Sequence, residues 1–245
     1  PSLGLWVAEL GHAWPFALSG IVAFGALLYF WRLRPHAVGA ASAVASPIVS
    51  APTTNPLRTV PRFFAQRPLR VAYVITTTRS VFWASVFIYG PIYVVEAGLP
   101  TWVGGALLSI VSSLLLLSPL INRLAARRGT RWVVTRAFTA IGLGALLLAA
   151  IGNARPIGLG AWGIAALGGA ALDVVGNIPF MRSVRQRDRV AMTGVFTTWR
   201  EVSALIAPAL ASIALALGSF RLFYAAIASL AAAAGAAATY LPRRL

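Results

Sequence analysis

Long apolar segments alternate with short polar loops along most of the 245-residue chain. The apolar residues of each segment follow one another without the strict alternation of a strand, and about 20 such residues suffice for a membrane-spanning helix. The pattern therefore predicts an all-α integral membrane protein with seven complete transmembrane helices. Their predicted ranges are 15–31, 71–95, 102–121, 132–152, 157–181, 190–217 and 222–241.

A shorter apolar stretch, residues 1–10, precedes the first predicted helix. It is too short to cross a membrane, it begins with Pro and not with Met, and it lacks the basic residues of a signal peptide. We interpret it as the end of a truncated helix and expect the chain to be a fragment of a longer protein. The alternative is a short interfacial segment in a complete chain.

The segment 32–70 interrupts the apolar pattern. It is rich in Ala, Ser, Thr and Pro, and its prolines are expected to prevent a long helix. Near its end, Phe63 and Phe64 stand among arginines, which is typical of a segment at the lipid headgroups. The sequence thus predicts three parts: the end of an N-terminal bundle at 1–31, a cytoplasmic linker at 32–70 and a six-helix bundle at 71–245.

The basic residues predict the orientation of the helices. All 21 are arginine, and they gather in every second loop, as expected when the positive loops lie inside. This places the linker and the C-terminus in the cytoplasm and predicts a multi-pass protein of a bacterial inner (plasma) membrane. The net charge of +16 does not indicate a nucleic-acid partner, because no basic face with interleaved aromatic residues is present.

Missing residue types exclude several functions. Without lysine, the chain has neither a Walker phosphate-loop lysine nor the amine for a retinal Schiff base. Without cysteine, it has no disulfide, zinc thiolate or redox pair. Two histidines are too few for a metal site, and no Ser/His pair or paired Asp falls within a predicted helix. We therefore expect no enzyme activity, no metal and no cofactor.

Two motifs accompany this topology. The residues PSLG at 1–4 resemble the end of a Pro-x-x-Gly motif on the fifth helix of many antiporters of the major facilitator superfamily. The residues NRLAARRGTR at 122–131 resemble the cytoplasmic loop signature of that family, G-R-L-A-D-R-x-G-R-R, although Ala126 replaces its Asp. The matching residues include Arg123, Arg127, Gly129 and Arg131. With its long basic linker before six spans, the chain resembles a transporter of this family from the end of the fifth helix onward.

The resemblance implies two six-helix bundles that rock about a central cavity in which a substrate binds. The expected function is secondary active transport by alternating access, coupled to protons. The expected partners are an unidentified small-molecule substrate, the lipid bilayer and the missing N-terminal bundle of the same chain. The alternative is a complete seven-helix receptor or scaffold without transport activity.

Apart from Arg136, which lies beside the second basic loop, four charged residues fall inside predicted helices: Arg79, Asp173, Arg200 and Glu201. At ~1.5 Å of rise per residue, all four lie roughly 12–17 Å from the cytoplasmic surface. A charge at such depth costs ~2.5–3.5 kcal/mol on insertion scales, so it usually faces a cavity or a partner. We therefore predict one polar layer in which these charges pair or line a cavity.

Asp173 is the candidate for proton coupling. Burial and a neighbouring arginine act in opposite directions on the proton affinity of a carboxylate, so a conformational change can switch its protonation. Arg79 and Arg200 either bind an anionic group of the substrate or hold Asp173 ionised. Alternatively, Arg79 extends to the interface and Arg200 and Glu201 pair between helices. The candidates for the polar cavity are Arg79, Asn177, Arg200, Glu201, Trp83 and Thr76.

Overall fold

The chain divides into two units, Pro1–Thr54 and Asn55–Leu245. The computed structural model describes residues 20–21, 23–29, 32, 56–151, 156–217 and 219–241. In the first unit the described residues are helical and exposed, and those at 20–29 fall within the predicted span 15–31. The other residues of that span, and the motif at 1–4, lie outside the described part of the chain.

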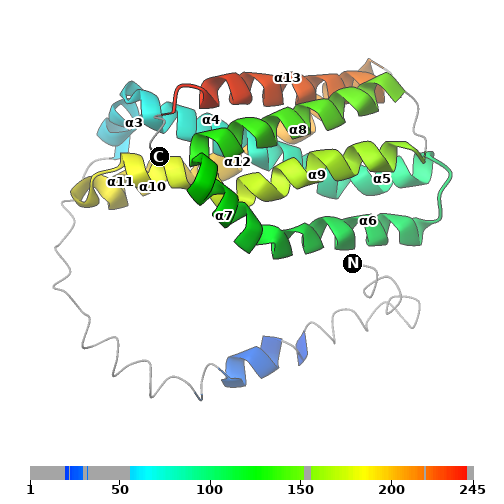
Figure 1. Cartoon of the computed structure of the whole chain (residues 1–245), viewed down its shortest axis with the longest axis horizontal. Coiled ribbons are helices and arrows are strands. Elements are labelled where there is room, and N and C mark those ends of the chain that lie inside the picture. Colours follow the sequence, from blue (N-terminus) through cyan, green and yellow to red (C-terminus); the bar gives the residue numbers. More distant parts are fainter. Residues whose placement is uncertain are drawn as a thin grey trace. The chain divides into compact units, whose positions relative to one another are not determined.

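The second unit is built from helices, with no strand among its described residues. Figure 1 shows several of them running side by side, and short π-helical or 3-10 segments interrupt some of them. In chain order they are α3 (Pro56–Ala65), α4 (Arg67–Ala84), η1 (Ser85–Tyr89), α5 (Gly90–Glu96), α6 (Thr101–Ser113), η2 (Leu114–Leu117), α7 (Ser118–Arg128), α8 (Thr130–Ile151), α9 (Gly158–Val175), α10 (Ile178–Ser183), η3 (Gln186–Asp188), α11 (Arg189–Thr197), α12 (Trp199–Ala216) and α13 (Phe220–Ala238).

Five helical stretches of this unit are long and apolar enough to cross a membrane. They are Arg67–Glu96, Thr101–Arg128, Thr130–Ile151, Gly158–Ser183 and Phe220–Ala238. Each overlaps a predicted span, so the all-α class and five of the apolar helices are confirmed within the described residues. The predicted span 190–217 is not among the five, and the predicted span 15–31 is only partly covered by the described residues.

The predicted helix 190–217 is divided at Thr198, which corrects the expectation of one uninterrupted span. Thr197 Oγ1 donates to the Gly194 carbonyl over 3.0 Å, and Thr198 Oγ1 donates to the Val195 carbonyl over 2.8 Å. Such bonds from a side chain to its own helix compete with the helical pattern and bend the backbone. The chain therefore forms α11 and α12 in place of one long helix.

Residues 56–70, which the sequence assigns to the linker, belong to the second unit and are helical except at Gln66, where α3 ends and α4 follows. Phe63 on α3 is fully buried, and its ring lies 6.5 Å from that of Phe180 on α10. Phe180 stacks in turn on Phe196 of α11, with ring centroids 3.9 Å apart. This aromatic cluster fixes the start of α4 against α10 and α11, because Leu69 is buried in the same cluster.

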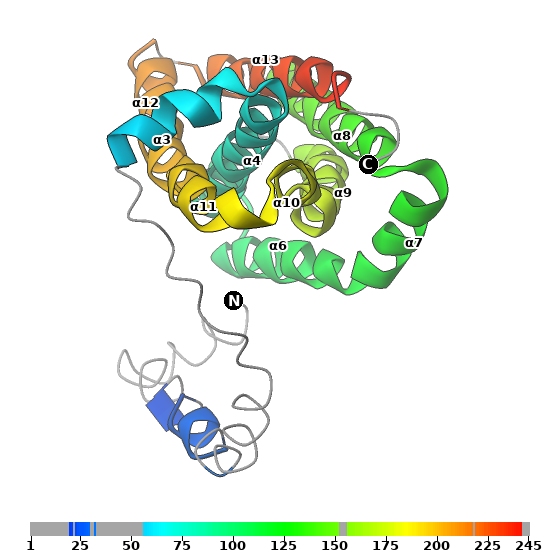
Figure 2. The same cartoon turned by 90° about the vertical axis from the view of Figure 1, so that its left-hand side faces the viewer.

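The helix α4 lies at the centre of the second unit. Figure 2 shows it surrounded by α12, α13, α9 and α10, all of which contact it. Two hydrogen bonds join it to the α11–α12 segment: Tyr73 Oη with Thr198 Oγ1 at 3.0 Å, and Ser80 Oγ with Ser203 Oγ at 2.8 Å. A polar side chain that points inward from α4 therefore meets several helices at once.

Small residues allow α8 and α9 to pack closely. A Cβ atom added to Gly144 would lie 2.6 Å from the Ala161 carbonyl oxygen and 2.8 Å from the Ala165 Cβ. One added to Gly168 would clash with the Ala137 carbonyl oxygen. Close approach at small residues is the usual way in which helices pack in membranes. The helices α8 and α9 are therefore closely packed, and Asp173 lies near the C-terminal end of α9.

Candidate functional site

The charged side chains of Arg79 on α4 and Asp173 on α9 meet inside the second unit. Arg79 Nε lies 3.4 Å from Asp173 Oδ1, and Arg79 Nη1 donates to the Leu172 carbonyl over 3.3 Å. The Arg79 side chain is 8% exposed and that of Asp173 is 29% exposed. The guanidinium group is therefore buried against α9, whereas the carboxylate keeps one side open.

Glycines on both sides of Asp173 make room for this pair. A Cβ atom added to Gly176 would lie 3.3 Å from Arg79 Nη1, so a larger residue would crowd the guanidinium group. One added to Gly169 would lie 2.5 Å from Phe82 Cε1 and 3.0 Å from Trp83 Cζ2. The spacing Gly-x₃-Asp-x₂-Gly on α9 thus permits the close approach of α4.

Two further candidates on α4 lie within a turn or so of Arg79. The indole N–H of Trp83 lies close to the Asp173 carboxylate, but the two groups do not form a hydrogen bond. The hydroxyl of the buried Thr76 donates to the Ala72 carbonyl over 2.9 Å. Trp83 is therefore adjacent to the pair, whereas the hydroxyl hydrogen of Thr76 is used within its own helix.

Trp199, which the sequence analysis did not single out, connects the pair to a second arginine. Its ring centroid lies 5.5 Å from the guanidinium carbon of Arg79 and 5.3 Å from that of Arg200. Both distances suit cation–π contacts. The only signal for Trp199 in the sequence is its position directly before Arg200, and the approach of α12 to α4 makes that position important.

The structure does not bring all the predicted charges into one paired layer. Arg200, Glu201 and Asn177 are exposed. Within the part of the chain that the structure describes, Arg79–Asp173 is the salt bridge that forms among the four charges, and Glu201 has no cation within 4.0 Å. Where the sequence predicts four paired charges, the structure therefore shows one ion pair, and Arg200 contacts the same Trp199 ring as Arg79.

The residues of the predicted cytoplasmic loop motif lie mostly on a helix. Arg123 and Arg127 are exposed on α7, which continues to Arg128, so the expected loop begins only at Gly129. Gly129 has φ +87° and ψ 148°, a conformation that favours glycine and ends the helix. Arg131 lies in the first turn of α8, and its Nη1 donates to the Leu241 carbonyl over 3.4 Å.

Comparison of the chain with protein-family models, with curated proteins and with solved structures found no match. The apolar helices and the Arg79–Asp173 ion pair are the features of the described residues that bear on function.

Proposed function

We propose that the second unit forms one bundle of a proton-coupled secondary transporter of the major facilitator type. The observation that carries this proposal is the Arg79–Asp173 pair, which joins two apolar helices while the Asp173 side chain remains 29% exposed. Charged residues within membrane-spanning helices are costly and most often belong to ion or substrate pathways. The proposed location is a bacterial inner membrane, with the C-terminus in the cytoplasm.

In this mechanism Asp173 carries the proton. While the carboxylate is ionised, its attraction for the Arg79 guanidinium holds α4 against α9, because attraction between charges is strong where little water is present. Protonation removes the negative charge and leaves the contact between Arg79 and the Leu172 carbonyl. The weakened link then allows α4 and α9 to move apart.

Release of Arg79 couples the proton to the substrate. A guanidinium group that has lost its carboxylate partner can donate several hydrogen bonds to an anionic or carbonyl group of a bound molecule. Arg200 extends the positive potential toward the exposed side, because its guanidinium group lies on the same indole ring. The substrate and the Asp173 carboxylate therefore compete for Arg79, and this competition is the proposed origin of coupling.

Uptake by everted membrane vesicles tests this proposal. The natural gene product is expressed in its host, a panel of radiolabelled small molecules is offered, and uptake is followed with and without a pH gradient. We expect uptake of at least one compound to require the gradient and to cease on addition of a protonophore. Uptake equal to that of vesicles without the protein, across a panel of anions, cations and neutral solutes, would contradict the proposal.

A further inference from the structure

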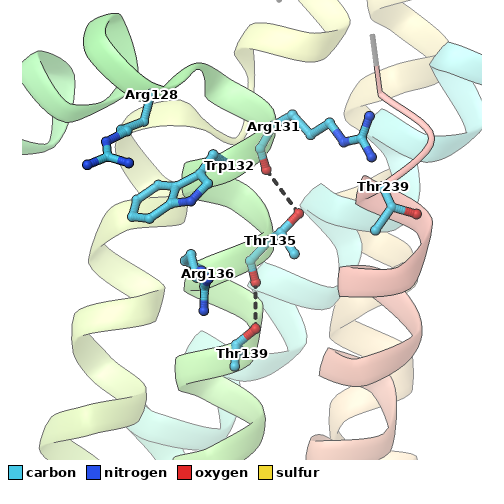
Figure 3. A pocket seen from close by; sticks show the side chains of 7 residues that line it. All are labelled: Arg128, Arg131, Trp132, Thr135, Arg136, Thr139 and Thr239. Carbon is cyan, nitrogen blue, oxygen red and sulfur yellow. Dashed lines mark hydrogen bonds between the residues drawn. The ribbon is translucent and has the colours of Figure 1, made fainter. Parts of the chain in front are cut away.

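A basic hollow lies between α8 and α13, away from the Arg79–Asp173 pair. Its volume is about 500 Å³. Figure 3 shows Arg128, Trp132 and Arg136 on one side and Arg131 beside Thr239 on the other. The lining residues are Arg128, Arg131, Trp132, Thr135, Arg136, Thr139 and Thr239.

The donors of this hollow suit an anion. No carboxylate lines it, and among the described residues none lies within 4.0 Å of its three arginines. The guanidinium carbons of Arg128 and Arg136 lie 5.8 and 5.6 Å from the centroid of the Trp132 ring. The threonines add little, because Thr135 and Thr139 donate their hydroxyl hydrogens to carbonyls of α8. Arg131 Nη1 donates to the Leu241 carbonyl. The donors left for an anion are therefore the N–H groups of Arg128 and Arg136 and the remaining N–H groups of Arg131, and they match the oxygens of a phosphate.

An apolar groove continues from the basic hollow along the same two helices. Its volume is about 370 Å³, and it shares Thr135, Thr139 and Thr239 with the basic hollow. The remaining lining residues are apolar: Phe138, Gly142, Leu143, Leu146, Ala228, Ala231, Ala232, Gly235 and Ala236. The groove exists because α13 presents alanine and glycine, whose short side chains do not fill the space beside α8.

We propose that the basic hollow and the apolar groove together bind one anionic phospholipid. The phosphate lies among Arg128, Arg131 and Arg136, and one acyl chain lies along the alanine face of α13. A free phosphate would use only the basic hollow, and a neutral acyl chain only the groove, whereas an anionic phospholipid uses both. Trp132 suits the level of the headgroups, and basic pockets between helices are known to hold such lipids. This inference rests on membrane insertion alone and does not depend on transport.

Native mass spectrometry of the full chain in detergent, with phosphatidylglycerol or phosphatidylcholine added, tests this site. We expect phosphatidylglycerol to be retained about tenfold better than phosphatidylcholine with the same chains, and the double variant Arg128→Gln/Arg136→Gln to lose that preference. The matched control Arg70→Gln/Arg182→Gln removes two exposed arginines outside the hollow. We expect it to keep the preference for phosphatidylglycerol. Equal retention of both lipids by the unaltered protein would overturn the proposal.

A second pair of variants tests the groove. Ala232 and Ala236 are exposed and line the groove, so Ala232→Leu/Ala236→Leu fills it without disturbing the core. We expect this variant to lose phosphatidylglycerol while Ala233→Leu, an exposed residue that does not line the groove, retains it. Unchanged retention by the groove variant would show that the acyl chain does not occupy the groove, and displacement of the lipid by millimolar inorganic phosphate would show a free-phosphate site. Either result would overturn the lipid assignment. Circular dichroism and a monodisperse elution profile establish that each variant is folded.

Discussion

Asp173→Asn is expected to reduce proton-driven uptake to the level of vesicles without the protein. Asparagine has nearly the same shape as aspartate, but it neither binds nor releases a proton and carries no charge to hold Arg79. Exchange of labelled for unlabelled substrate without a pH gradient is expected to persist, because exchange requires movement of the helices but no net proton transfer. Uptake and exchange are measured side by side in the same everted vesicles at matched expression.

Glu96→Gln provides the matched control for this result. Glu96 is exposed at the end of α5, and the change removes one carboxylate as Asp173→Asn does. We expect the control to retain proton-driven uptake. Proton-driven uptake by Asp173→Asn equal to that of the control would remove Asp173 from the proton pathway. Loss of exchange together with uptake would mean that the residue serves binding or folding and not proton transfer.

Arg79→Gln is expected to lower the free energy of unfolding by about 3 kcal/mol, at the lower end of the range for breaking a buried ion pair. The lower end applies because Asp173 is 29% exposed and water can partly solvate the carboxylate that remains. Addition of Asp173→Asn to Arg79→Gln is expected to recover part of this loss, since it removes the unpaired charge. The free energy of unfolding is measured by titration with sodium dodecyl sulfate in mixed micelles. It is measured for the unaltered protein, the two single variants and the double variant, which together form a double-mutant cycle.

A coupling free energy of at least about 1 kcal/mol between the two substitutions would be consistent with direct pairing. The same cycle with Arg200→Gln and Glu201→Gln serves as a control, because both residues are exposed and do not form a salt bridge. We expect that cycle to be additive. Additivity at Arg79 and Asp173 as well would contradict the pair as a link between α4 and α9.

The length of the apolar segments predicted much of the fold, and the departures lie at Thr198 and at 56–65. The break at Thr198 follows from the hydroxyls of Thr197 and Thr198, which donate to carbonyls one turn earlier in the helix. Mean hydropathy along the sequence does not detect such bonds. The helix at 56–65 was missed because its prolines were interpreted as helix breakers. Phe63 is nevertheless buried by α10 and α11, and this contact is not visible in the local sequence.

The depth of residues along the helices predicted part of the site. Arg79 and Asp173 lie at similar depths from the predicted cytoplasmic ends of their helices, and the structure brings them together. Depth alone does not show which face of a helix a residue occupies, so Arg200 and Glu201 were expected in the same paired layer although both are exposed. Trp199 and the Ser80–Ser203 bond depend on the approach of α12 to α4, which no local pattern records.

We propose that Asp173 borders a water-filled pathway that opens to the two sides of the membrane in turn. The chain contains no cysteine, so Asn177→Cys introduces a lone thiol one turn beyond Asp173, at an exposed position. Labelling by a membrane-impermeant maleimide is measured in right-side-out and everted vesicles, with the pH gradient in each direction. The account predicts labelling from both sides, with the favoured side changing when the gradient is reversed. Labelling from one side only, at a rate that the gradient does not affect, would contradict alternating access.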